Sequence, residues 1–314
     1  MVSPTPTPPK RGLVIPMPNI TQLRKTYPPH LSVSDLDILL SSTLKKPKEF
    51  IFAHPEYPIS IIQYLRFRWF IHRYRQGYSV AAITHHKEFF DLDFYVNRHT
   101  LIPRPETEMM VEEVIEKIKK TTNQKNILID VGTGSGCIPI AINKTIKQCN
   151  NKTITTLAID ISRPALRVAH HNARTHNVFI NFLHGNLLEP LLTNSELRTK
   201  NSELVIITAN LPYLTHEQFA SEPSVQREPY SALVAEKTGL ALYEKLLQQF
   251  STLITKYLIS NIQYYLFFEI DPSQSSAITL LIKNHLPHAS VEIKKDLARR
   301  DRLVAIQINR KYPD

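Results

Sequence analysis

From about residue 104 onward the sequence alternates between strand-like and helix-like stretches, and this alternation restricts the possible folds more than any other feature. The strand-like stretches are KNILIDV, ITTLAID, VFINFLHG, ELVIITAN and YYLFFEI, followed by the terminal pair ASVEIKKD and RLVAIQI. The helix-like stretches between them include ETEMMVEEVIEKIKK, SRPALRVAHHNARTH and GLALYEKLLQQF. Such alternation is typical of a mostly parallel sheet with helices on both faces. We therefore expect a doubly wound α/β domain over residues 104–314.

The residues before this domain have a different pattern. Residues 31–86 predict a small helical domain, and residues 87–103 predict a hairpin linker. Within IIQYLRFRWFIHRYRQ, Ile62, Leu65 and Trp69 fall at i, i+3 and i+7, which predicts that they face the core. The arginines interleaved with them could bind RNA or an acidic protein surface, although arginines on an amphipathic helix more often stay solvated.

Residues 1–30 predict a tail that is either disordered or directs targeting. Before Asp35 the N-terminal region contains lysine and arginine but no carboxylate, which suits a mitochondrial presequence. Eight prolines within residues 1–29 oppose the amphipathic helix that such a signal usually forms. We expect targeting to the mitochondrial matrix, with a simple disordered tail as the alternative.

The composition narrows the function classes. No apolar run reaches the ~18 residues of a membrane span, which argues against an integral membrane protein. The only cysteines, Cys137 and Cys149, form neither a disulfide framework nor a CxxC metal pattern, and this favours a reducing compartment. The thirteen histidines show no metal-ligand spacing, so we expect no metal site. The formal charge of +10 favours acidic partners such as RNA, a matrix-type compartment, or simply a solvated basic surface.

Three of the seven glycines lie close together in ILIDVGTGSGCIPIAI, at positions 132, 134 and 136. A strand, a tight glycine loop and a helix start in this order let the backbone approach a ligand closely. Asp160 ends the next strand-like stretch, where an acid can accept hydrogen bonds from ribose hydroxyls. The loop alone also suits a dinucleotide, a sulfonium cofactor or a close-packed turn. Because the spacing is not GxGxxG and no P-loop Lys-Ser/Thr follows, we expect a grip on a nucleoside rather than on phosphate.

A polar and aromatic segment, Asn210-Leu211-Pro212-Tyr213, ends the fourth strand-like stretch. In an open α/β sheet it should face the same crevice as the glycine loop. Asn210 offers a side-chain carbonyl, and Pro212 restricts the backbone that carries the Leu211 carbonyl. Two convergent acceptors suit one planar NH2 group, and Tyr213 can pack against the group that bears it. Such positioning for attack on a sulfonium methyl can supply ~7–11 kcal/mol, although a plain strand-ending turn is the alternative.

Several motifs together resemble those of the HemK/PrmC methyltransferases, over about residues 78–308. They are LIPRPETE, DVGTGSGCIPIAI, AIDISRPALRVAHHNA, NLPYL, EPYSAL with TGLALYEKLL, and KDLARRDR. The resemblance implies a seven-stranded class I methyltransferase sheet with a helical N-terminal domain for substrate recognition. It also implies S-adenosyl-L-methionine-dependent methylation of the glutamine N5 in the Gly-Gly-Gln motif of a class I peptide-chain release factor. We expect the fungal mitochondrial form, a monomer that binds neither membranes nor, stably, nucleic acid.

The resemblance also assigns site residues. The expected cofactor-binding residues are Gly132, Thr133, Gly134, Ser135 and Gly136 at the methionine end, Asp160 at the ribose, Asn186 and Leu187 beside the adenine, and Asn210. The expected catalytic and substrate-binding residues are Asn210, Leu211, Pro212 and Tyr213, with Arg104, Pro105, Glu106 and Thr107 closing the pocket. Pro105 and the acids after it also make a good helix start, and both interpretations can hold together.

Two positions depart from the usual family pattern, and two rival functions stay open. The family usually has proline where this chain has Leu211, and commonly has aspartate at the position of Asn186. Asn-Leu-Pro-Tyr is also the form found in adenine-N6 dimethyltransferases of small-subunit ribosomal RNA, and the positive charge would suit RNA. A non-catalytic RNA-binding or assembly factor is the second rival function.

Glu269 is located at the end of the fifth strand-like stretch and is therefore expected to lie near the crevice. A structural role for it is at least as common as a role in the chemistry.

Overall fold

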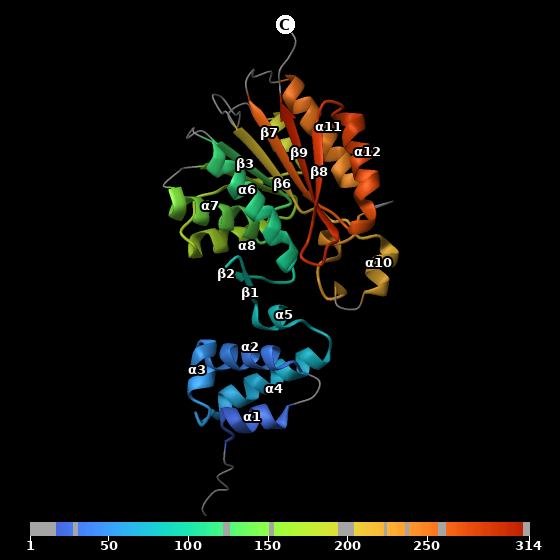
Figure 1. Ribbon diagram of the computed structural model, residues 1–314. Helices are drawn as coiled ribbons and strands as arrows, with labels where there is room; N and C mark the ends of the chain where they lie inside the picture. The colour runs from blue at the N-terminus through green and yellow to red at the C-terminus, as the bar shows by residue number, and fades with distance from the viewer. Residues whose placement is uncertain are drawn as a thin grey trace, which may run out of the picture. The chain divides into compact units, whose positions relative to one another are not determined.

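The computed structural model describes residues 17–27, 31–121, 126–150, 154–193, 204–222, 225–235, 239–256 and 262–309 (Figure 1). The chain divides into two compact units, Met1–Thr84 and His85–Asp314. The division falls two residues before the expected end of the helical domain. No helix among the described residues combines the length and apolar character needed to cross a membrane.

The first unit is helical. Its helices are α1 (Ile20–Thr26), α2 (Val33–Leu44), α3 (Lys48–Ala53), α4 (Ile61–Arg75) and α5 (Val80–Thr84). Side chains of Asn19, Ser32 and Ser60 cap the starts of α1, α2 and α4 by accepting a backbone N–H. The expectation of a tail over residues 1–30 was wrong for α1, because Ile20 and Leu23 are buried in the core of this unit.

The apolar stripe expected to face the core from α4 faces solvent instead. Ile62, Leu65 and Trp69 are 77, 57 and 51% exposed, whereas Phe67 and Phe70 on another face of the helix are buried. The helix therefore carries apolar residues on more than one face, and periodicity alone did not identify the buried one.

The second unit contains a seven-stranded sheet. Its strands are β3 (Asn126–Val131), β4 (Ile154–Asp160), β5 (Asn181–His184), β6 (Leu204–Ala209), β7 (Gln263–Glu269), β8 (Ser290–Lys295) and β9 (Asp301–Asn309). They lie in the order β5-β4-β3-β6-β7-β9-β8, and only the pairs that include β9 are antiparallel. This is the doubly wound, mostly parallel sheet that the alternation predicts.

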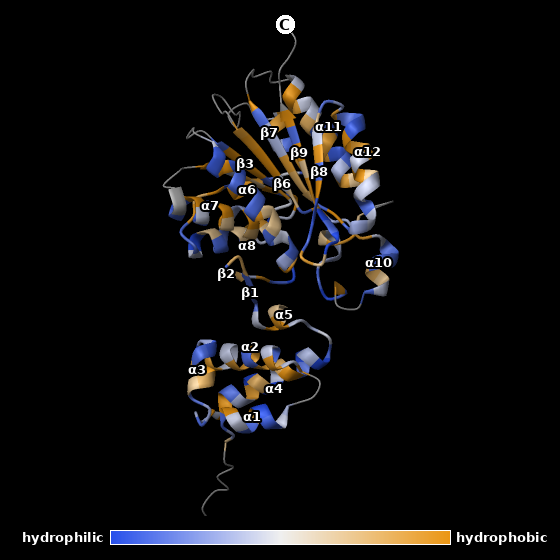
Figure 2. Cartoon of the chain, viewed as in Figure 1, coloured by the Kyte–Doolittle hydropathy of each residue, from blue (hydrophilic) through white to orange (hydrophobic). Residues whose placement is uncertain are grey.

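Helices cover both faces of this sheet. The helices of this unit are α6 (Glu108–Lys120), α7 (Cys137–Asn150), α8 (Arg163–Thr175), α9 (Glu189–Thr193), α10 (His216–Ser221), α11 (Ala241–Lys256) and α12 (Ser275–His285), of which α10 buries no residue. Along β3, Leu128 joins the core formed with α6 and α7, while Ile129 joins the core formed with α11 and α12. Successive residues point to opposite faces, so a central strand covered on both sides is mostly apolar. Figure 2 shows this apolar centre between more polar outer helix faces.

A two-stranded hairpin, β1 (His86–Phe89) and β2 (Leu92–Tyr95), precedes α6 and belongs to the second unit. Asn172 of α8 attaches it to the rest of the unit. Its Nδ2 donates to the carbonyl oxygens of Tyr95 and Ser135, each at 2.9 Å, and its Oδ1 accepts from the N–H of Tyr95 at 2.9 Å. One buried amide thus connects the hairpin, α8 and the glycine loop.

Candidate active site

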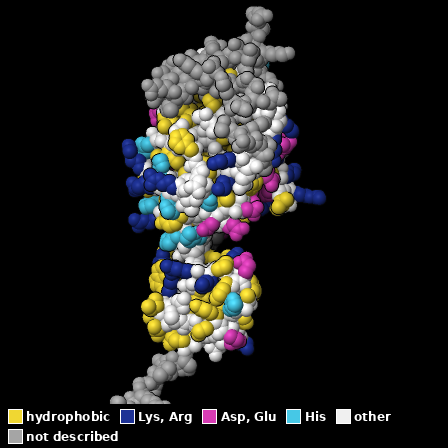
Figure 3. Space-filling model, turned by 90° about the vertical axis from the view of Figure 1, so that its left-hand side faces the viewer, with side chains coloured by type: hydrophobic (Ala, Val, Ile, Leu, Met, Phe, Trp, Pro, Cys, Tyr) yellow, Lys and Arg dark blue, Asp and Glu magenta, His cyan; other side chains and the backbone are white. Residues whose placement is uncertain are grey.

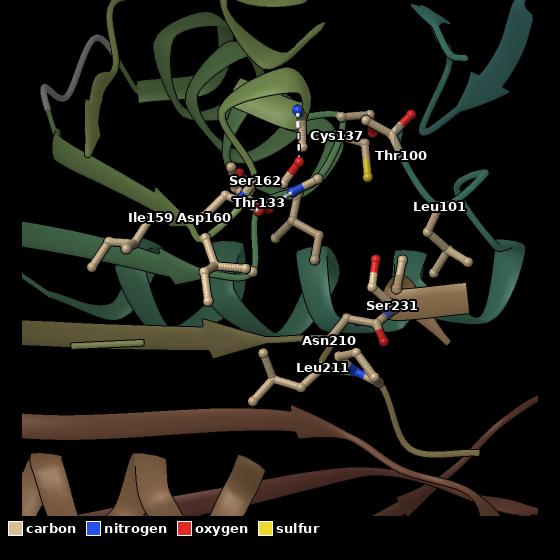
Figure 4. A pocket seen from close by; sticks show the side chains of 18 of the residues that line it. Thr100, Leu101, Thr133, Cys137, Ile159, Asp160, Ser162, Asn210, Leu211 and Ser231 are labelled. Atoms are coloured by element: carbon tan, nitrogen blue, oxygen red, sulfur yellow. Dashed lines mark hydrogen bonds between the residues drawn. The ribbon is translucent and has the colours of Figure 1, made fainter. Parts of the chain in front are cut away.

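A cavity that is partly open to solvent lies at the carboxyl ends of β3, β4 and β6. The loops after parallel strands reach the same edge of the sheet, which explains why distant motifs meet there. Figure 4 shows Asp160 and Thr133 on one side of the cavity and Asn210 and Leu211 on another. The predicted site residues that line it are Arg104, Thr107, Gly132, Thr133, Gly134, Ser135, Asp160, Asn186, Leu187, Asn210, Leu211 and Pro212.

The glycine loop joins β3 to α7 and is held against β4 by backbone hydrogen bonds. The N–H groups of Gly132 and Thr133 donate to the carbonyl oxygen of Ile159 at 2.8 and 3.0 Å. Gly132 has a φ of +73°, and a Cβ there would lie 2.9 Å from Cδ2 of Leu211. Glycine alone suits this combination of backbone angle and close approach. The loop therefore comes up against the segment that follows β6.

Gly136, expected beside the methionine end of the cofactor, is not among the residues of the cavity wall. It has a φ of +79°, and a Cβ there would lie 3.1 Å from Cδ1 of Ile140 and 3.2 Å from Cβ of Ala169. Ala169 belongs to α8, and Ile140 to α7. The position therefore serves the close packing of these two helices.

Asp160 is the last residue of β4 and its carboxylate is already oriented. Its Oδ2 accepts from the N–H of Gly134 and its Oδ1 from the N–H of Ser162, each at 2.8 Å. Burial raises the pKa of Asp160 above its usual value, and the two N–H donors oppose that change. A carboxylate has about four acceptor sites, so each oxygen can accept a further hydrogen bond from a hydroxyl in the cavity.

The turn after β5 carries Asn186 and Leu187 into the cavity wall. Leu187 has a φ of +58°, a left-handed conformation that leucine rarely adopts. Gln249 of α11 holds this turn, since its Nε2 donates to the carbonyl oxygen of Asn186 at 3.3 Å and its Oε1 accepts from the N–H of Leu188 at 2.7 Å. Two hydrogen bonds from α11 thus hold this turn in its left-handed conformation.

Asn210 and Leu211 follow β6 directly. The side-chain Nδ2 of Asn210 donates to Oγ1 of Thr107 at 3.2 Å. The backbone N–H of Leu211 donates to the hydroxyl of Tyr243 at 3.3 Å, and the Leu211 side chain is buried. Both residues therefore have defined partners where the segment after β6 meets the cavity.

Tyr213 does not line the cavity, and this differs from the expectation that it packs beside the group to be methylated. Its hydroxyl donates to Oε1 of Glu269 at 3.4 Å, and its carbonyl oxygen accepts from Nε2 of Gln274 at 3.1 Å. Burial raises the pKa of Tyr213 strongly, so it stays a neutral phenol. The ring turns toward the end of β7, where it helps to hold a buried carboxyl group.

The loop before α6 is bound to the loop that contains EPYSAL. Arg104 Nη2 donates to Oε1 of Glu228 at 2.5 Å, and the N–H of Ile102 donates to Oε2 at 3.1 Å. Pro105 opens the short 3-10 helix η1 (Pro105–Thr107), and Glu106 lies on it outside the cavity wall. The pocket-closing role expected of Glu106 is therefore not found, whereas Arg104 and Thr107 do reach the cavity.

Sequence reasoning missed several residues of the cavity wall. They are His99, Thr100, Leu101, Pro103, Cys137, Ile138, Ile159, Ile161, Ser162, Ala165, Gly185, Ser231, Ala232 and Leu242. All of them except His99, Thr100 and Gly185 fall within the motifs that carry the family resemblance, so the motifs contained a signal for these eleven. Burial raises the pKa of the Cys137 thiol to about 12, which keeps it from acting as a thiolate nucleophile.

A cationic surface lies beside the cavity on α8. The helix has no acidic residue, and it exposes Arg163, Arg167, His170, His171 and Arg174. Figure 3 shows dark-blue and cyan side chains gathered on this face of the second unit. No group of three or more His, Cys, Asp and Glu residues that could hold a metal ion occurs in the described parts of the chain.

Comparisons with known proteins agree with this geometry. A family model described as "Ribosomal protein L11 methyltransferase (PrmA)" matches residues 105–212, less than half of the chain. The release factor glutamine methyltransferase of Bacillus anthracis is 30% identical over 275 residues, which cover 87% of this chain and 91% of that protein. The chain belongs to the release factor glutamine methyltransferase family. The member from Enterococcus faecalis is 34% identical over 228 residues, covering 72% of this chain and 74% of its own length.

A solved structure shares the fold of this family member. The catalytic domain of human METTL16, in complex with MAT2A 3′UTR hairpin 6, superposes with a TM-score of 0.50 at 16% identity, covering 72% of this chain and 79% of that one. At this identity the similarity concerns the fold alone. It confirms the seven-stranded fold, and the relatives confirm the resemblance at the level of the family.

Proposed function

We propose that this chain transfers the methyl group of S-adenosyl-L-methionine to the side-chain N5 of the glutamine in the Gly-Gly-Gln motif of a class I peptide-chain release factor. The observation that carries the proposal is the position of Asn210 after β6, in the same cavity as the glycine loop and Asp160. The names of the bacterial relatives support the substrate. The product, a methylated release factor, would function in translation termination.

The polar groups of the cavity fit such a cofactor. Asp160 has acceptor sites left for the ribose hydroxyls, and the glycine loop exposes its backbone to the cavity. Thr133 of the glycine loop also lines the cavity, so it can contact the methionine end. Asn186 and Leu187 line the part assigned to the adenine. When bound, the cofactor supplies a methyl group on a positively charged sulfur.

The residues of the chain then act by positioning. The glutamine N5 is a weak nucleophile because its lone pair is delocalised, so its alignment matters more than a strong base. Asn210 Oδ1 and the Leu211 carbonyl oxygen accept hydrogen bonds from the two N–H groups of the amide. These bonds orient N5 for attack on the methyl group. The bound cofactor would supply its methyl group to this aligned nitrogen, and the proton that N5 gives up would pass to water, since the cavity is partly open to solvent.

The proposal includes a mitochondrial release factor as the substrate. The positive charge of the chain and its acid-free N-terminal stretch support this part of it. The N-terminal stretch before residue 17 lies outside the described residues.

The experiment measures transfer of labelled methyl from S-adenosyl-L-methionine to a mitochondrial release factor. A Gln→Ala variant of its Gly-Gly-Gln loop and small-subunit ribosomal RNA run in parallel. Label on the wild-type factor alone is the expected result. Label on the RNA alone would assign the site to adenine methylation, and no label together with no cofactor affinity would favour a non-catalytic protein.

A further inference from the structure

We infer that Glu269 and Thr107 are positioning residues that fix which end of the Asn210 side-chain amide faces the cavity. This inference rests on the proposed function, since it concerns the group that accepts the substrate N–H. The three residues come from three different elements: Glu269 ends β7, Thr107 ends η1, and Asn210 follows β6.

The three side chains form a continuous hydrogen-bonded chain. Thr107 Oγ1 donates to Oε2 of Glu269 at 2.6 Å, and Asn210 Nδ2 donates to the same Oγ1 at 3.2 Å. Glu269 and Thr107 are each only 2% exposed, so water does not compete for these bonds. Thr107 and Asn210 line the cavity, while Glu269 does not.

The direction of this chain follows from the hydrogen atoms available. The single hydroxyl hydrogen of Thr107 is donated to Oε2 of Glu269, which is the direction that a carboxylate, as an acceptor only, requires. The remaining lone pairs of Oγ1 can then accept only from an N–H, which selects Nδ2 of Asn210. A flipped amide would place Oδ1 against those lone pairs. The amide is therefore held with its NH2 on Thr107 and its carbonyl oxygen as the free end.

The surroundings of Glu269 hold the carboxylate in place. Its Oε1 accepts from the hydroxyl of Tyr213 at 3.4 Å, and its backbone carbonyl oxygen accepts from the hydroxyl of Tyr243. Burial raises the pKa of Glu269 above its usual value, while the hydrogen bond from Thr107 and the positive charge of Arg302 act in the opposite direction. The network thus accounts for a buried acid that does not reach the cavity, and for the orientation of Tyr213 away from it.

The end of the Asn210 amide that faces the cavity determines whether Asn210 can accept a hydrogen bond from the substrate glutamine. With Oδ1 toward the cavity, Asn210 accepts an N–H of the glutamine amide. With the NH2 group there, a donor would meet a donor, and the substrate nitrogen would lose its alignment. Cofactor binding uses other groups and should not change.

The test compares Thr107→Val, which keeps the shape but removes the hydroxyl, with Thr107→Ser, which keeps the hydroxyl. We expect Thr107→Val to lower kcat for methyl transfer on the order of 10- to 100-fold, the loss typical of a hydrogen bond to a charged group. Cofactor affinity should stay within about 3-fold, and Thr107→Ser should stay within about 3-fold of wild type in both. An equal loss in Thr107→Ser, or a parallel loss of cofactor affinity, would overturn the inference.

A second variant separates orientation from the penalty of an unpaired buried charge. The double change Thr107→Val with Glu269→Gln leaves no buried carboxylate without its donor, so its thermal stability should exceed that of Thr107→Val alone. We expect its kcat to remain as low as that of the single variant. A return to wild-type kcat would show that the unpaired charge, and not the amide orientation, caused the loss.

A spectroscopic measurement distinguishes failure of this inference from failure of the proposed function. The side-chain amide signals of Asn210 in a ¹⁵N–¹H spectrum are identified by their loss in Asn210→Ala. They should shift in Thr107→Val and stay in place in Thr107→Ser, whether or not a release factor is methylated. Signals that do not respond to Thr107→Val would refute the network, while responsive signals in an enzyme that labels no release factor would refute only the function.

Discussion

The backbone N–H of Leu211 donates a hydrogen bond to the hydroxyl of Tyr243, 3.3 Å away, at a position where the family usually has proline. Tyr243 is fully buried, and its hydroxyl in turn donates to the carbonyl oxygen of Glu269. Leucine therefore contributes a bond that proline could not make, while its carbonyl remains available to a substrate.

Replacing Leu211 by proline should lower stability and spare activity. The lost hydrogen bond is worth about 1 kcal/mol of unfolding free energy, in addition to the lost packing of the buried Leu211 side chain, which Leu211→Ala measures separately. Methyl transfer should stay within about 3-fold of wild type, because the backbone carbonyl is unchanged. Denaturant unfolding and a methyl-transfer assay measure the two effects, with Leu211→Ala as a control that keeps the N–H. A 100-fold fall in activity in Leu211→Pro alone would show that the N–H itself matters for catalysis.

Asn210→Ala should abolish methyl transfer and leave cofactor affinity nearly unchanged. The change removes the acceptor for the substrate amide, whereas the glycine loop and Asp160 stay intact. Isothermal titration with the cofactor and a single-turnover methyl-transfer assay give the two numbers. Equal losses in both would mean that Asn210 acts on the cofactor side of the cavity.

Asp160→Ala should show the opposite pattern. Loss of the carboxylate removes acceptors for the ribose hydroxyls and also the bonds from Gly134 and Ser162. We expect the cofactor Kd to rise on the order of 10- to 100-fold, with kcat at saturating cofactor less affected. Unchanged cofactor affinity would remove Asp160 from the binding site.

Breaking the bond between Arg104 and Glu228 should impair the closure of the cavity. Glu228→Ala leaves the Arg104 guanidinium and the Ile102 N–H without their acceptor. We expect kcat/KM for the protein substrate to fall by about 10-fold, and Arg104→Ala to add little to Glu228→Ala in the double variant. Glu116→Ala, which breaks the exposed pair with Lys120 on α6, is the matched control and should leave activity unchanged. Additive losses from Arg104 and Glu228 would show that they act separately.

The buried carboxyl of Asp130 should make stability depend on pH. Burial raises the pKa of Asp130 from 3.8 to about 6, so the folded state binds this proton more tightly than the unfolded state does. Its contribution is fully present below about pH 4 and is lost as the pH rises through about 6, by about 3 kcal/mol. Asp130→Asn keeps an acceptor for Thr208, whose hydroxyl lies 2.7 Å from Oδ1, and removes the titration.

Unfolding measured between pH 4 and pH 7 checks this prediction. The stability of Asp130→Asn relative to wild type should rise across that range. A constant difference would show that Asp130 keeps an ordinary pKa in the folded protein.

The sequence predicted the second unit well because its information is local and repetitive. Each strand is a short apolar run, and parallel topology alone brings Asp160 and Asn210 to one edge of the sheet. The α4 helix had no such constraint. Both Ile62-Leu65-Trp69 and Phe67-Phe70 are apolar at helical spacing, and only the packing of the first unit decides between them.

The parts of the site that the sequence did not predict depend on long-range partners. Tyr213 was expected beside the substrate, but a buried acid 56 residues later binds its hydroxyl. The role of Thr107 likewise depends on Glu269, 162 residues away. No local pattern contains such pairings, since they exist only once the strands lie side by side.

The three bonds of Asn172 have a consequence for how the chain can be divided. A fragment that begins at His85 keeps the hairpin, all residues of the cavity wall and the partners of this amide, so it should be an autonomous domain. A fragment that begins at residue 104, where the alternating pattern starts, would leave Asn172 with two bonds to Tyr95 unmade in the interior. The hairpin is thus a structural part of the second unit and is needed for the independent folding of that unit.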